Sequence, residues 1–467
     1  MNFSDLFFLY FFLPLSLICY YAFKKPAYRN IVLLVCSLVF YAWGAMSFLP
    51  LLVLAALFNW FIGLCLKRYA GSRGAAFLCG LGILVNLGLL AVFKYAGFIT
   101  ENINALFGAS FAVPKLGLPL GISFYTFRLI SYLLDVQWEK VEPEKNFGRF
   151  LLYVSLFPCV VSGPIVRYVE LRDSLGTREV SVKQLSAGAS RLIAGLAKKV
   201  LIADMLSSVT SELFGADVAS VSVLGCWFGA MLFALQMYFD FSGYSDMAIG
   251  IAGLFGLPFP ENFNYPFLCK SIAEFWQRWH ITLGSFFRDY LLYVPIFGRQ
   301  RKYGGLFLVW LATGIWHGAA WNYIIWGLYF GLFILIETML GKKRMKKIPL
   351  WIKHVCTKLI LIVGFGIFRF EDTAQLGAFL RGLIGANGNA FCDSLLGHTA
   401  ANNLFLIAVA LLFCFPVIPA LRRRLERTPA GTILCGAGTV VCNVGLLVIS
   451  SILLVSATSN PFLYANF

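Results

Sequence analysis

A single histidine lies in the middle of a long apolar stretch of this sequence, and its side chain could take or give a proton. Between Leu306 and Ile336, His317 is the only residue whose side chain titrates near neutral pH. An isolated ionisable group in an apolar run of membrane length is costly to keep, so it marks a functional site by default. The structural alternative is a neutral imidazole that forms hydrogen bonds between two helices.

The residues around His317 favour a lined cavity. In a helix, side chains three or four positions apart share a face, and the face of this segment would carry Trp310, Thr313, His317 and Trp321. Small residues nearby leave room for another backbone or for a substrate chain: Gly314, Gly318, Ala319 and Ala320.

A second histidine block precedes the first and is separated from it by one loop and one helix. The block runs from Pro260 to Tyr290. It is predicted to be helical from Ser271, because Ser271 can cap the start and Glu274 and Arg278 are spaced as an i,i+4 ion pair. One side of that helix would carry Trp276, Gln277, His280 and Gly284. The helix is too polar to span a membrane, so it would lie at the cytoplasmic interface or dip inward as a re-entrant element. An interfacial anchor is the alternative, and two neighbouring histidine blocks favour a site.

Other polar groups stand in apolar surroundings upstream. Asp240 and Asp246 flank Gly243. They could do acid–base work, hold a cation or, more simply, accept hydrogen bonds where a helix is broken at Gly243. Arg128 and Arg167 lie in segments interrupted by proline and glycine, which are typical of discontinuous helices. Either arginine could meet an anionic donor; a salt bridge or a side chain that snorkels to the interface is the alternative.

The composition is that of a polytopic membrane protein. Of 467 residues, 60% are hydrophobic and 13% are charged, which excludes a soluble globular protein. We expect about eleven or twelve full spans plus re-entrant pieces. The first apolar stretch has no basic start and no small-residue cleavage pattern, so we expect it to stay as a helix. The candidate spans are residues 6–23, 31–45, 48–66, 75–93, 118–137, 150–163, 190–213, 221–239, 243–257, 305–321, 322–340, 354–370, 403–420 and 432–457.

The net charge of +16 comes from basic residues in short loops, and this location argues against nucleic-acid binding. The lysine and arginine residues lie between apolar stretches and form neither a basic face nor a nucleic-acid-binding motif. The positive-inside rule places the basic loops at residues 24–29, 67–73, 342–347 and 422–424 on the cytoplasmic side. Both termini are then extracytoplasmic, and residues 371–402 form the main extracytoplasmic loop. The twelve cysteines lack zinc-ligand spacing, so no metal site is expected.

Several motifs, taken in order, give the chain a resemblance to the membrane-bound O-acyltransferase superfamily. Within it, the chain is most similar to the bacterial membrane subunits that O-acetylate alginate. The resemblance covers nearly the whole chain. It is carried by FSDLFFL from Phe3, FKY at 93–95, LPLGISFYTFRLISYLLD at 118–135, SGPIVRY at 162–168, GLAKKVLIAD at 195–204, DFSGYSDMAIG at 240–250, PENFNYP at 260–266, FWQRWH at 275–280, WHGAAW at 316–321 and PFLYANF at 461–467.

This resemblance implies an all-helical membrane bundle with a central funnel, formed by one domain over residues 1–467. Its catalytic core would span residues 118–340, and C-terminal helices and a tail would follow at 354–467. The superfamily is marked by two histidines, of which the deeper is essential; the deeper matches His317 and the other matches His280. The ending Phe462-x-Tyr464-x-x-Phe467 resembles a motif in which a tyrosine carries the acyl group as an ester. An interfacial belt of aromatic residues is the alternative for this tail.

We therefore expect a bacterial inner-membrane enzyme that moves an acetyl group from a cytoplasmic thioester donor, such as acetyl-CoA, to an extracytoplasmic polysaccharide. His317 would be the general base on the attacking hydroxyl, and Tyr464 would accept the acyl group. His280 and its neighbours Trp276, Trp316 and Arg278 would line the donor entrance. Asn322 or nearby backbone N–H groups would stabilise the oxyanion. The other expected substrate-binding residues are Arg128, Arg167 and Asp240.

A thioester is already activated, so no cofactor beyond the donor is expected. A separate extracytoplasmic acetyltransferase of the SGNH type is the expected partner. D-Alanyl transfer to teichoic acid is an alternative in the same class. A polysaccharide exporter or transporter, and an assembly scaffold, are alternatives from other classes; the chain shows no clear inverted repeats of the kind that transporters use.

Overall fold

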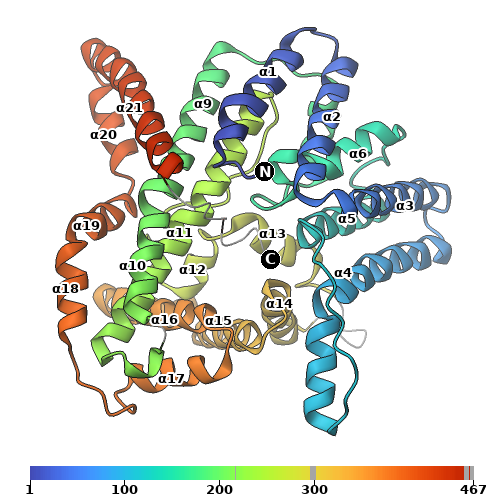
Figure 1. The fold of residues 1–467 in the computed structure, drawn as a ribbon. Helices are drawn as coiled ribbons and strands as arrows, with labels where there is room; N and C mark the ends of the chain where they lie inside the picture. The colour runs from blue at the N-terminus through green and yellow to red at the C-terminus, as the bar shows by residue number, and fades with distance from the viewer. Residues whose placement is uncertain (216, 295–300, 457–461, 463–467) are drawn as a thin grey trace. The chain divides into compact units, whose positions relative to one another are not determined.

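The computed structural model describes residues 1–215, 217–294, 301–456 and 462, and every element in those residues is helical (Figure 1). Their sole β-type pairing is an isolated antiparallel bridge between Phe263 and Trp279. In lipid, a helix satisfies its own backbone N–H and C=O groups, which explains why so apolar a chain folds in this way. The expected all-helical class is confirmed.

Within the described residues, six helices are long and apolar enough to cross a membrane. A seventh span results if α18 (Ser394–Asn402) and α19 (Leu404–Phe413), which meet at a 65° bend, are counted together. The chain is therefore a multi-pass membrane protein. Fewer segments meet this criterion than the about eleven or twelve expected, because several expected spans form short helices. For example, α5 (Ile122–Gln137) and α14 (Lys302–His317) have 16 residues each.

The chain divides into two compact units. The first comprises Met1–Leu192 and Tyr244–Glu261, and the second comprises Ile193–Gly243 and Asn262–Leu463. Helices α9 (Val182–Ala197) and α11 (Val223–Leu254) contribute residues to both units. The expected single domain stays a prediction.

Aromatic side chains and buried amides hold the first unit together. The Phe40 ring lies 5.9 Å from that of Phe8 and 5.7 Å from that of Phe157, measured between centroids. Asn59 of α3 and Asn86 of α4 exchange side-chain hydrogen bonds of 2.7 and 3.1 Å, which stabilise this helix pair in apolar surroundings. Besides α5, its elements are η1 (Phe8–Phe12), α1 (Leu13–Tyr21), α2 (Pro26–Ala45), η2 (Met46–Phe48), α3 (Leu49–Arg68), α4 (Arg73–Phe107), α6 (Phe147–Ser155), α7 (Phe157–Val160) and α8 (Tyr168–Gly176).

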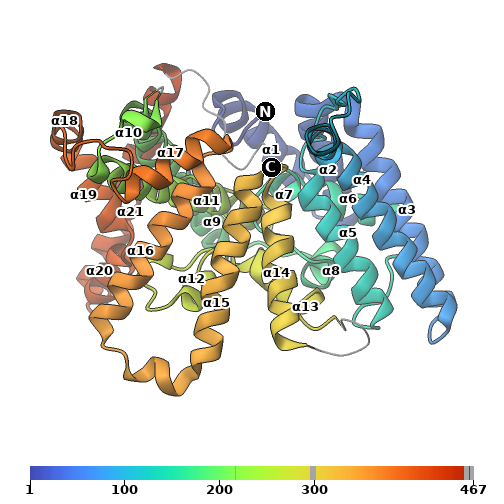
Figure 2. The ribbon, with the colours of Figure 1, turned by 90° about the horizontal axis from the view of Figure 1, so that it is seen from below.

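In the second unit, α14, α15 (Trp321–Lys347) and α16 (Leu350–Arg369) lie side by side (Figure 2). Glycines allow α14 and α15 to approach closely. A Cβ on Gly314 would come within 2.5 Å of the Tyr323 carbonyl oxygen, and a Cβ on Gly327 within 2.5 Å of the Trp310 carbonyl oxygen. The expectation that Gly314 admits another backbone is confirmed.

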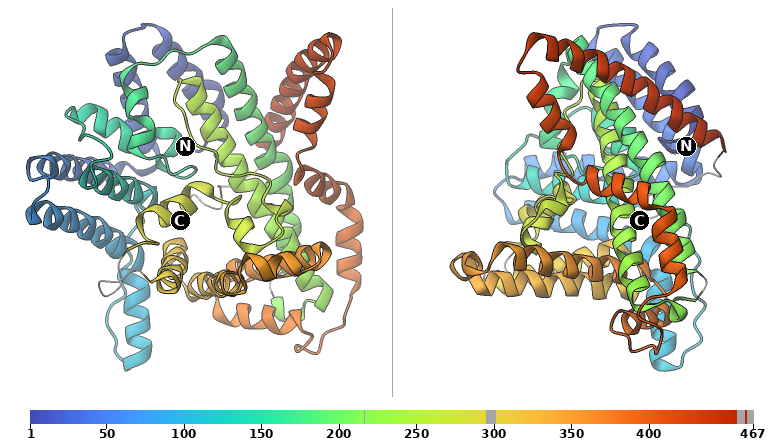
Figure 3. Two further views of the ribbon diagram at one scale, coloured as in Figure 1. Left: turned by 180° about the vertical axis from the view of Figure 1, so that it is seen from behind. Right: turned by 90° about the vertical axis from the view of Figure 1, so that its left-hand side faces the viewer.

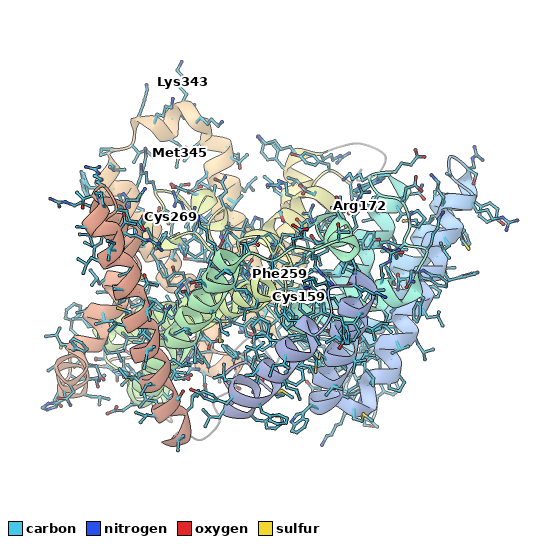
Figure 4. All side chains as sticks on the ribbon, turned by 90° about the horizontal axis from the view of Figure 1, so that it is seen from above. Cys159, Arg172, Phe259, Cys269, Lys343 and Met345 are labelled. Carbon is cyan, nitrogen blue, oxygen red and sulfur yellow. The ribbon has the colours of Figure 1, made fainter. Side chains whose placement is uncertain are left out.

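The basic run 342–347 lies where α15 turns into α16, and Lys343 and Met345 project from this turn (Figure 4). The backbone is kinked at Gly341, whose φ is 71°. Near the C-terminus, α20 (Val417–Leu425) and α21 (Pro429–Ser456) meet at a turn that follows Arg422–Arg424 (Figure 3). The other elements of the unit are η3 (Lys198–Ala203), α10 (Asp204–Phe214), η4 (Val218–Ser220), η5 (Pro266–Leu268), α12 (Ile272–Trp276), α13 (Ile281–Tyr290), α17 (Thr373–Leu383), α18 (Ser394–Asn402) and α19 (Leu404–Phe413).

Helix α11 is continuous through Gly243, so the expected break at this glycine is wrong. A Cβ on Gly243 would come within 2.8 Å of the Gly195 carbonyl oxygen. The glycine is therefore needed for close packing against the segment around Gly195 rather than for a turn.

Candidate active site

Backbone pairing brings two separate polar segments of the second unit together. Phe263 and Trp279 form the isolated bridge, the Asn264 N–H donates to the Arg278 carbonyl oxygen at 2.9 Å, and the Ile281 N–H donates to the Asn262 carbonyl oxygen at 3.0 Å. Asn262 is thereby placed beside His280, eighteen residues further along the chain.

This pairing also breaks the helix expected over 271–290. The expected start is confirmed: Ser271 accepts the Glu274 N–H at 3.1 Å, and Glu274 forms the ion pair with Arg278 at 2.9 Å. The helix then stops, and His280 adopts a left-handed conformation with φ 45° before α13 begins. The expected common face of Trp276, Gln277, His280 and Gly284 is therefore wrong. A non-glycine residue at positive φ is strained, and such strain is concentrated at functional sites.

Asn262 fixes the protonation of the His280 ring. Its Oδ1 lies 3.0 Å from His280 Nδ1 and accepts hydrogen bonds from the Thr282 N–H at 3.3 Å and the Thr282 hydroxyl at 2.8 Å. A backbone N–H can only donate, so the Asn262 atom that faces it is the carbonyl oxygen, and His280 Nδ1 must donate to that same oxygen. His280 Nε2 is then the basic nitrogen; it is buried and has no hydrogen-bond partner among the described residues. Burial lowers the pKa of His280 to about 3, so the ring is neutral at physiological pH.

His317 is the last residue of α14, and aromatic rings surround it. It is 2% exposed. Its ring centroid lies 4.7 Å from that of Trp326, 4.9 Å from that of Trp316 and 5.2 Å from that of Phe368. The Trp316 ring also lies 6.0 Å from the His280 ring, so both histidines pack against one indole. The chain leaves the helix at Gly318, and Trp321 begins α15 with 48% exposure, so the expected face shared by His317 and Trp321 is wrong.

A cluster of tryptophans extends from His317 toward α12. The Trp276 ring lies 5.0 Å from that of Trp310 and 5.4 Å from that of Trp326. The indole N–H groups of Trp276 and Trp326 are buried and have no hydrogen-bond acceptor among the described residues. Leaving a buried donor unsatisfied costs about 1–3 kcal/mol. Two such donors in one cluster are explained if a ligand supplies the acceptor.

The cluster is held in place by groups from two neighbouring helices. The Glu337 carboxylate accepts the backbone N–H groups of Ile272 and Ala273 at 2.7 and 2.9 Å, and so caps the N-terminus of α12. Lys358 of α16 donates to the Cys269 carbonyl oxygen at 2.9 Å. These contacts fix the segment that carries Trp276 against α15 and α16.

Asn322 and Arg278 are engaged in structural contacts. The Asn322 amide nitrogen donates to the Phe368 carbonyl oxygen at 3.0 Å and to the Ile367 carbonyl oxygen at 3.4 Å, so it ties the start of α15 to the end of α16. Its donors are therefore directed at helix-end carbonyls rather than at a ligand. Arg278 donates to Glu274 and, at 3.3 Å, to the Asn264 carbonyl oxygen.

Asp240 lies in a buried ionic cluster. Lys199 Nζ is 2.7 Å from the Asp240 carboxylate and 2.8 Å from that of Asp204. The same ammonium lies 4.7 Å from the centroid of the Phe462 ring, which is 1% exposed. Phe462 belongs to the C-terminal motif, whereas Tyr464 lies outside the described residues. Within the second unit, this cluster joins three separate segments of the chain.

Arg128 and Arg167 belong to the first unit. Arg128 is fully buried on α5; its Nη1 donates to the Val154 carbonyl oxygen at 3.2 Å, and its guanidinium lies 4.5 Å from the Tyr153 ring centroid. Arg128 Nε and Nη2 are buried without partners among the described residues. The Arg167 N–H donates to Glu170 at 2.8 Å at the start of α8.

Sequence reasoning missed four residues, of which three contact a histidine and the fourth, a lysine, contacts the Asp240 carboxylate. They are Asn262, Trp326, Phe368 and Lys199. Asn262 lies inside the PENFNYP motif, but nothing in the sequence shows which residue it contacts. Lys199 could have been found from charge balance, because an Asp240 carboxylate in an apolar run needs a cation.

The profile of the membrane-bound O-acyltransferase family matches residues 144–350, which include both histidines. A protein named "Probable alginate O-acetylase AlgI" from Pseudomonas aeruginosa is 40% identical to this chain over 382 residues, covering 80% of this chain and 72% of that protein. A "Peptidoglycan O-acetyltransferase" from Helicobacter pylori is 33% identical over 424 residues, covering 82% of this chain and 80% of that protein. A "Teichoic acid D-alanyltransferase" from Bacillus subtilis is 30% identical over 245 residues, covering 49% of this chain and 62% of that protein.

Proposed function

We propose that this chain, which belongs to the membrane-bound O-acyltransferase family and is an acyltransferase, O-acetylates an extracytoplasmic polysaccharide. The relatives named for alginate and peptidoglycan O-acetylation match about four fifths of the chain, whereas the D-alanyltransferase matches 49% of it. That difference in coverage favours acetyl over D-alanyl transfer.

The observation that carries the proposal is that two buried histidines pack against one tryptophan ring in an aromatic enclosure. Such an enclosure keeps water from the reacting atoms, so an acyl group is passed to the intended hydroxyl instead of being hydrolysed. His317 takes the proton of that hydroxyl while the hydroxyl oxygen attacks the thioester carbonyl. The C–O bond forms, the C–S bond breaks, and the proton leaves on the released thiol. His280 Nε2 accepts a hydrogen bond from the donor chain and holds it in place.

We assign the stabilisation of the oxyanion to Trp276 and Trp326 instead of Asn322. The amide donors of Asn322 are directed at carbonyl oxygens of α16, whereas the two indole N–H groups lack an acceptor among the described residues. A donor that is already in place when negative charge develops on the carbonyl oxygen stabilises the transition state more than the ground state.

The depth of His317 supports transfer across the membrane. It lies fifteen positions after Lys302 at the basic end of α14, which corresponds to about 22 Å along a helix axis. The hydrocarbon core of a bilayer is about 30 Å thick. If the basic end faces the cytoplasm, the base lies nearer the opposite face. A cytoplasmic thioester such as acetyl-CoA would then enter from the basic end, and both chain termini would be extracytoplasmic.

Tyr464 is our proposed acceptor of the acetyl group, from which an extracytoplasmic SGNH-type partner would take it. Phe462, two residues earlier, is buried beside Lys199. A phenol is a better leaving group than a sugar hydroxyl, so an acetyl-tyrosine ester can pass its acyl group onward. Tyr464→Phe keeps the aromatic ring and removes only the hydroxyl; it should abolish polysaccharide acetylation and the acetyl mass increment on the C-terminal peptide. Full acetylation by this variant would show that the acetyl group does not pass through Tyr464.

The test of the base compares two histidine variants in the purified protein after incubation with isotopically labelled acetyl-CoA. His317→Gln should eliminate transfer to any acceptor, including the C-terminal peptide. His398→Gln changes an exposed histidine of α18 and should retain transfer. Equal transfer by both variants at equal protein level would remove His317 from the chemistry.

A further inference from the structure

The first unit contains a cavity of ≈ 480 Å³ at one end of its helices. This volume lies within the range of small-ligand sites, about 300–1,000 Å³. Its wall includes Gly253 near the end of α11, Gly256 just beyond that end, and polar residues of α8, α9 and the loop between them. Those polar residues are Ser174, Thr177, Arg178, Glu179, Gln184 and Arg191.

One of the two arginines in this wall is neutralised. Arg191 Nε donates to Asp246 at 3.0 Å, its Nη1 donates to Glu261 at 2.6 Å, and its Nη2 also contacts both carboxylates. With two acidic partners, Arg191 serves to hold α9 against α11 and leaves no excess positive charge.

The other arginine in this wall, Arg178, differs because it lies beside a second arginine, Arg29. The guanidinium groups of Arg29 and Arg178 lie 5.0 and 5.7 Å from the centroid of the same Tyr20 ring. Their hydrogen bonds go to neutral oxygens: Arg29 donates to the carbonyl oxygens of Phe23 and Arg178, and Arg178 Nη2 donates to Asn30 Oδ1 at 2.5 Å. Arg178 Nη1 is buried and has no hydrogen-bond partner among the described residues.

Two adjacent guanidinium groups repel each other unless an anion lies between or beside them. The buried Nη1 of Arg178 lacks an acceptor, and the cavity offers room for one. Hydroxyl and amide donors of Ser174, Thr177 and Gln184 line the same space. Planar guanidinium groups match the oxygens of phosphate better than other cationic side chains do. Glu179 also lines the cavity, but it is exposed and can turn toward solvent.

We propose that this cavity binds a phosphate group, with Arg178 as the direct ligand and Arg29 adding positive charge beside it. The site is independent of the acyl-transfer chemistry. It lies next to the basic loop 24–29, which the positive-inside rule places at the cytoplasmic surface. A phosphate there comes either from the headgroup of an anionic lipid or from a soluble phosphate-bearing molecule.

The experiment measures dissociation constants of the purified full-length protein in detergent for two probes. Dioctanoyl phosphatidylglycerol tests the lipid source, with dioctanoylglycerol as its phosphate-free counterpart, and inorganic phosphate tests the soluble source. Arg178→Gln should weaken binding at least about tenfold, because one charge-assisted hydrogen bond and one charge are lost. Arg172→Gln removes one positive charge from an exposed residue of the preceding helix α8, which pairs with Asp173, and should change binding less than twofold.

Binding of the lipid probe alone, of inorganic phosphate alone, or of both, with the loss in Arg178→Gln, supports the site and identifies its source. Binding of neither probe overturns the proposal, and so does unchanged binding by Arg178→Gln. Gel-filtration elution and thermal midpoint verify that each variant is folded. If Arg178→Gln does not fold, Arg29→Gln replaces it, because this variant leaves the direct ligand in place and should still weaken binding severalfold; unchanged binding by Arg29→Gln then overturns the proposal.

Discussion

Replacing Asn262 by alanine should disable His280 without touching either histidine. Asn262 Oδ1 accepts from His280 Nδ1 at 3.0 Å and from the backbone and hydroxyl of Thr282. The Thr282 hydroxyl can rotate toward another acceptor, but the His280 Nδ1–H and the Thr282 N–H would be left buried and unsatisfied. At about 1–3 kcal/mol for each donor, the variant should lose about 2–6 kcal/mol of stability. Loss of the tautomer that keeps Nε2 basic should slow acetyl transfer roughly 5- to 150-fold.

Two further variants distinguish loss of the His280 tautomer from a general loss of stability. Asn264→Ala removes the same amide from an exposed position two residues away and should leave both stability and rate unchanged. Asn262→Asp keeps an acceptor and adds a carboxylate, which favours the imidazolium and raises the pKa of His280 from its lowered value. As pH falls through that raised pKa, Nε2 gains a proton and transfer should decline. In the wild type, protonation of His280 should not change the rate between about pH 5 and 8.

The assay combines a thermal midpoint with the rate of transfer from labelled acetyl-CoA at equal protein concentration. Because Asn262 acts through His280, Asn262→Ala should be no slower than His280→Gln once both are measured below their thermal midpoints. A rate for Asn262→Ala within twofold of that for Asn264→Ala would refute the assignment of the tautomer.

Three other perturbations follow from the packing. Trp326→Phe keeps an aromatic ring beside His317 and removes the indole N–H, so kcat should fall at least about tenfold with little change in KM; an unchanged kcat would exclude Trp326 as an oxyanion donor. Lys199→Met leaves the carboxylates of Asp204 and Asp240 buried without their cation and should destabilise the protein by about 3–5 kcal/mol; a thermal midpoint equal to that of wild type would contradict the buried cluster. Gly327→Val forces α14 and α15 apart and should cost about 1–3 kcal/mol or more, whereas Gly445→Ala, where no atom lies within 4 Å of the new Cβ, should be neutral.

Local signals in the sequence predicted local structure well. The capping of α12 by Ser271 and the Glu274–Arg278 pair depend on residues three or four positions apart, so spacing alone identifies them. The need for small residues where α14 meets another helix was likewise visible at Gly314. The all-helical membrane class followed from composition, because only helices satisfy the backbone of so apolar a chain in lipid.

Long-range contacts decided what the sequence did not predict. The helix expected over 271–290 breaks at His280 because Asn262 and Asn264 form backbone hydrogen bonds with Ile281 and Arg278. No residue near His280 in the sequence predicts that pairing. Gly243 looked like a helix break, but it lies inside α11, where it allows close packing against Gly195. The spacing that joined Trp321 to His317 failed because the chain leaves the helix at Gly318. The first two outcomes depend on tertiary contacts, and the third depends on the end of α14 at His317.

We propose that an acetyl group crosses the membrane at His317. The most direct measurement uses proteoliposomes in which the purified protein has one fixed orientation, with labelled acetyl-CoA, which does not cross lipid, supplied only on the face that carries the 342–347 turn. Labelled acetyl esters should form on the opposite face, on the C-terminal peptide or on added polysaccharide, and His317→Gln should abolish them while His398→Gln should not. Label found only on the donor face, or equal transfer by the His317→Gln variant, would contradict it.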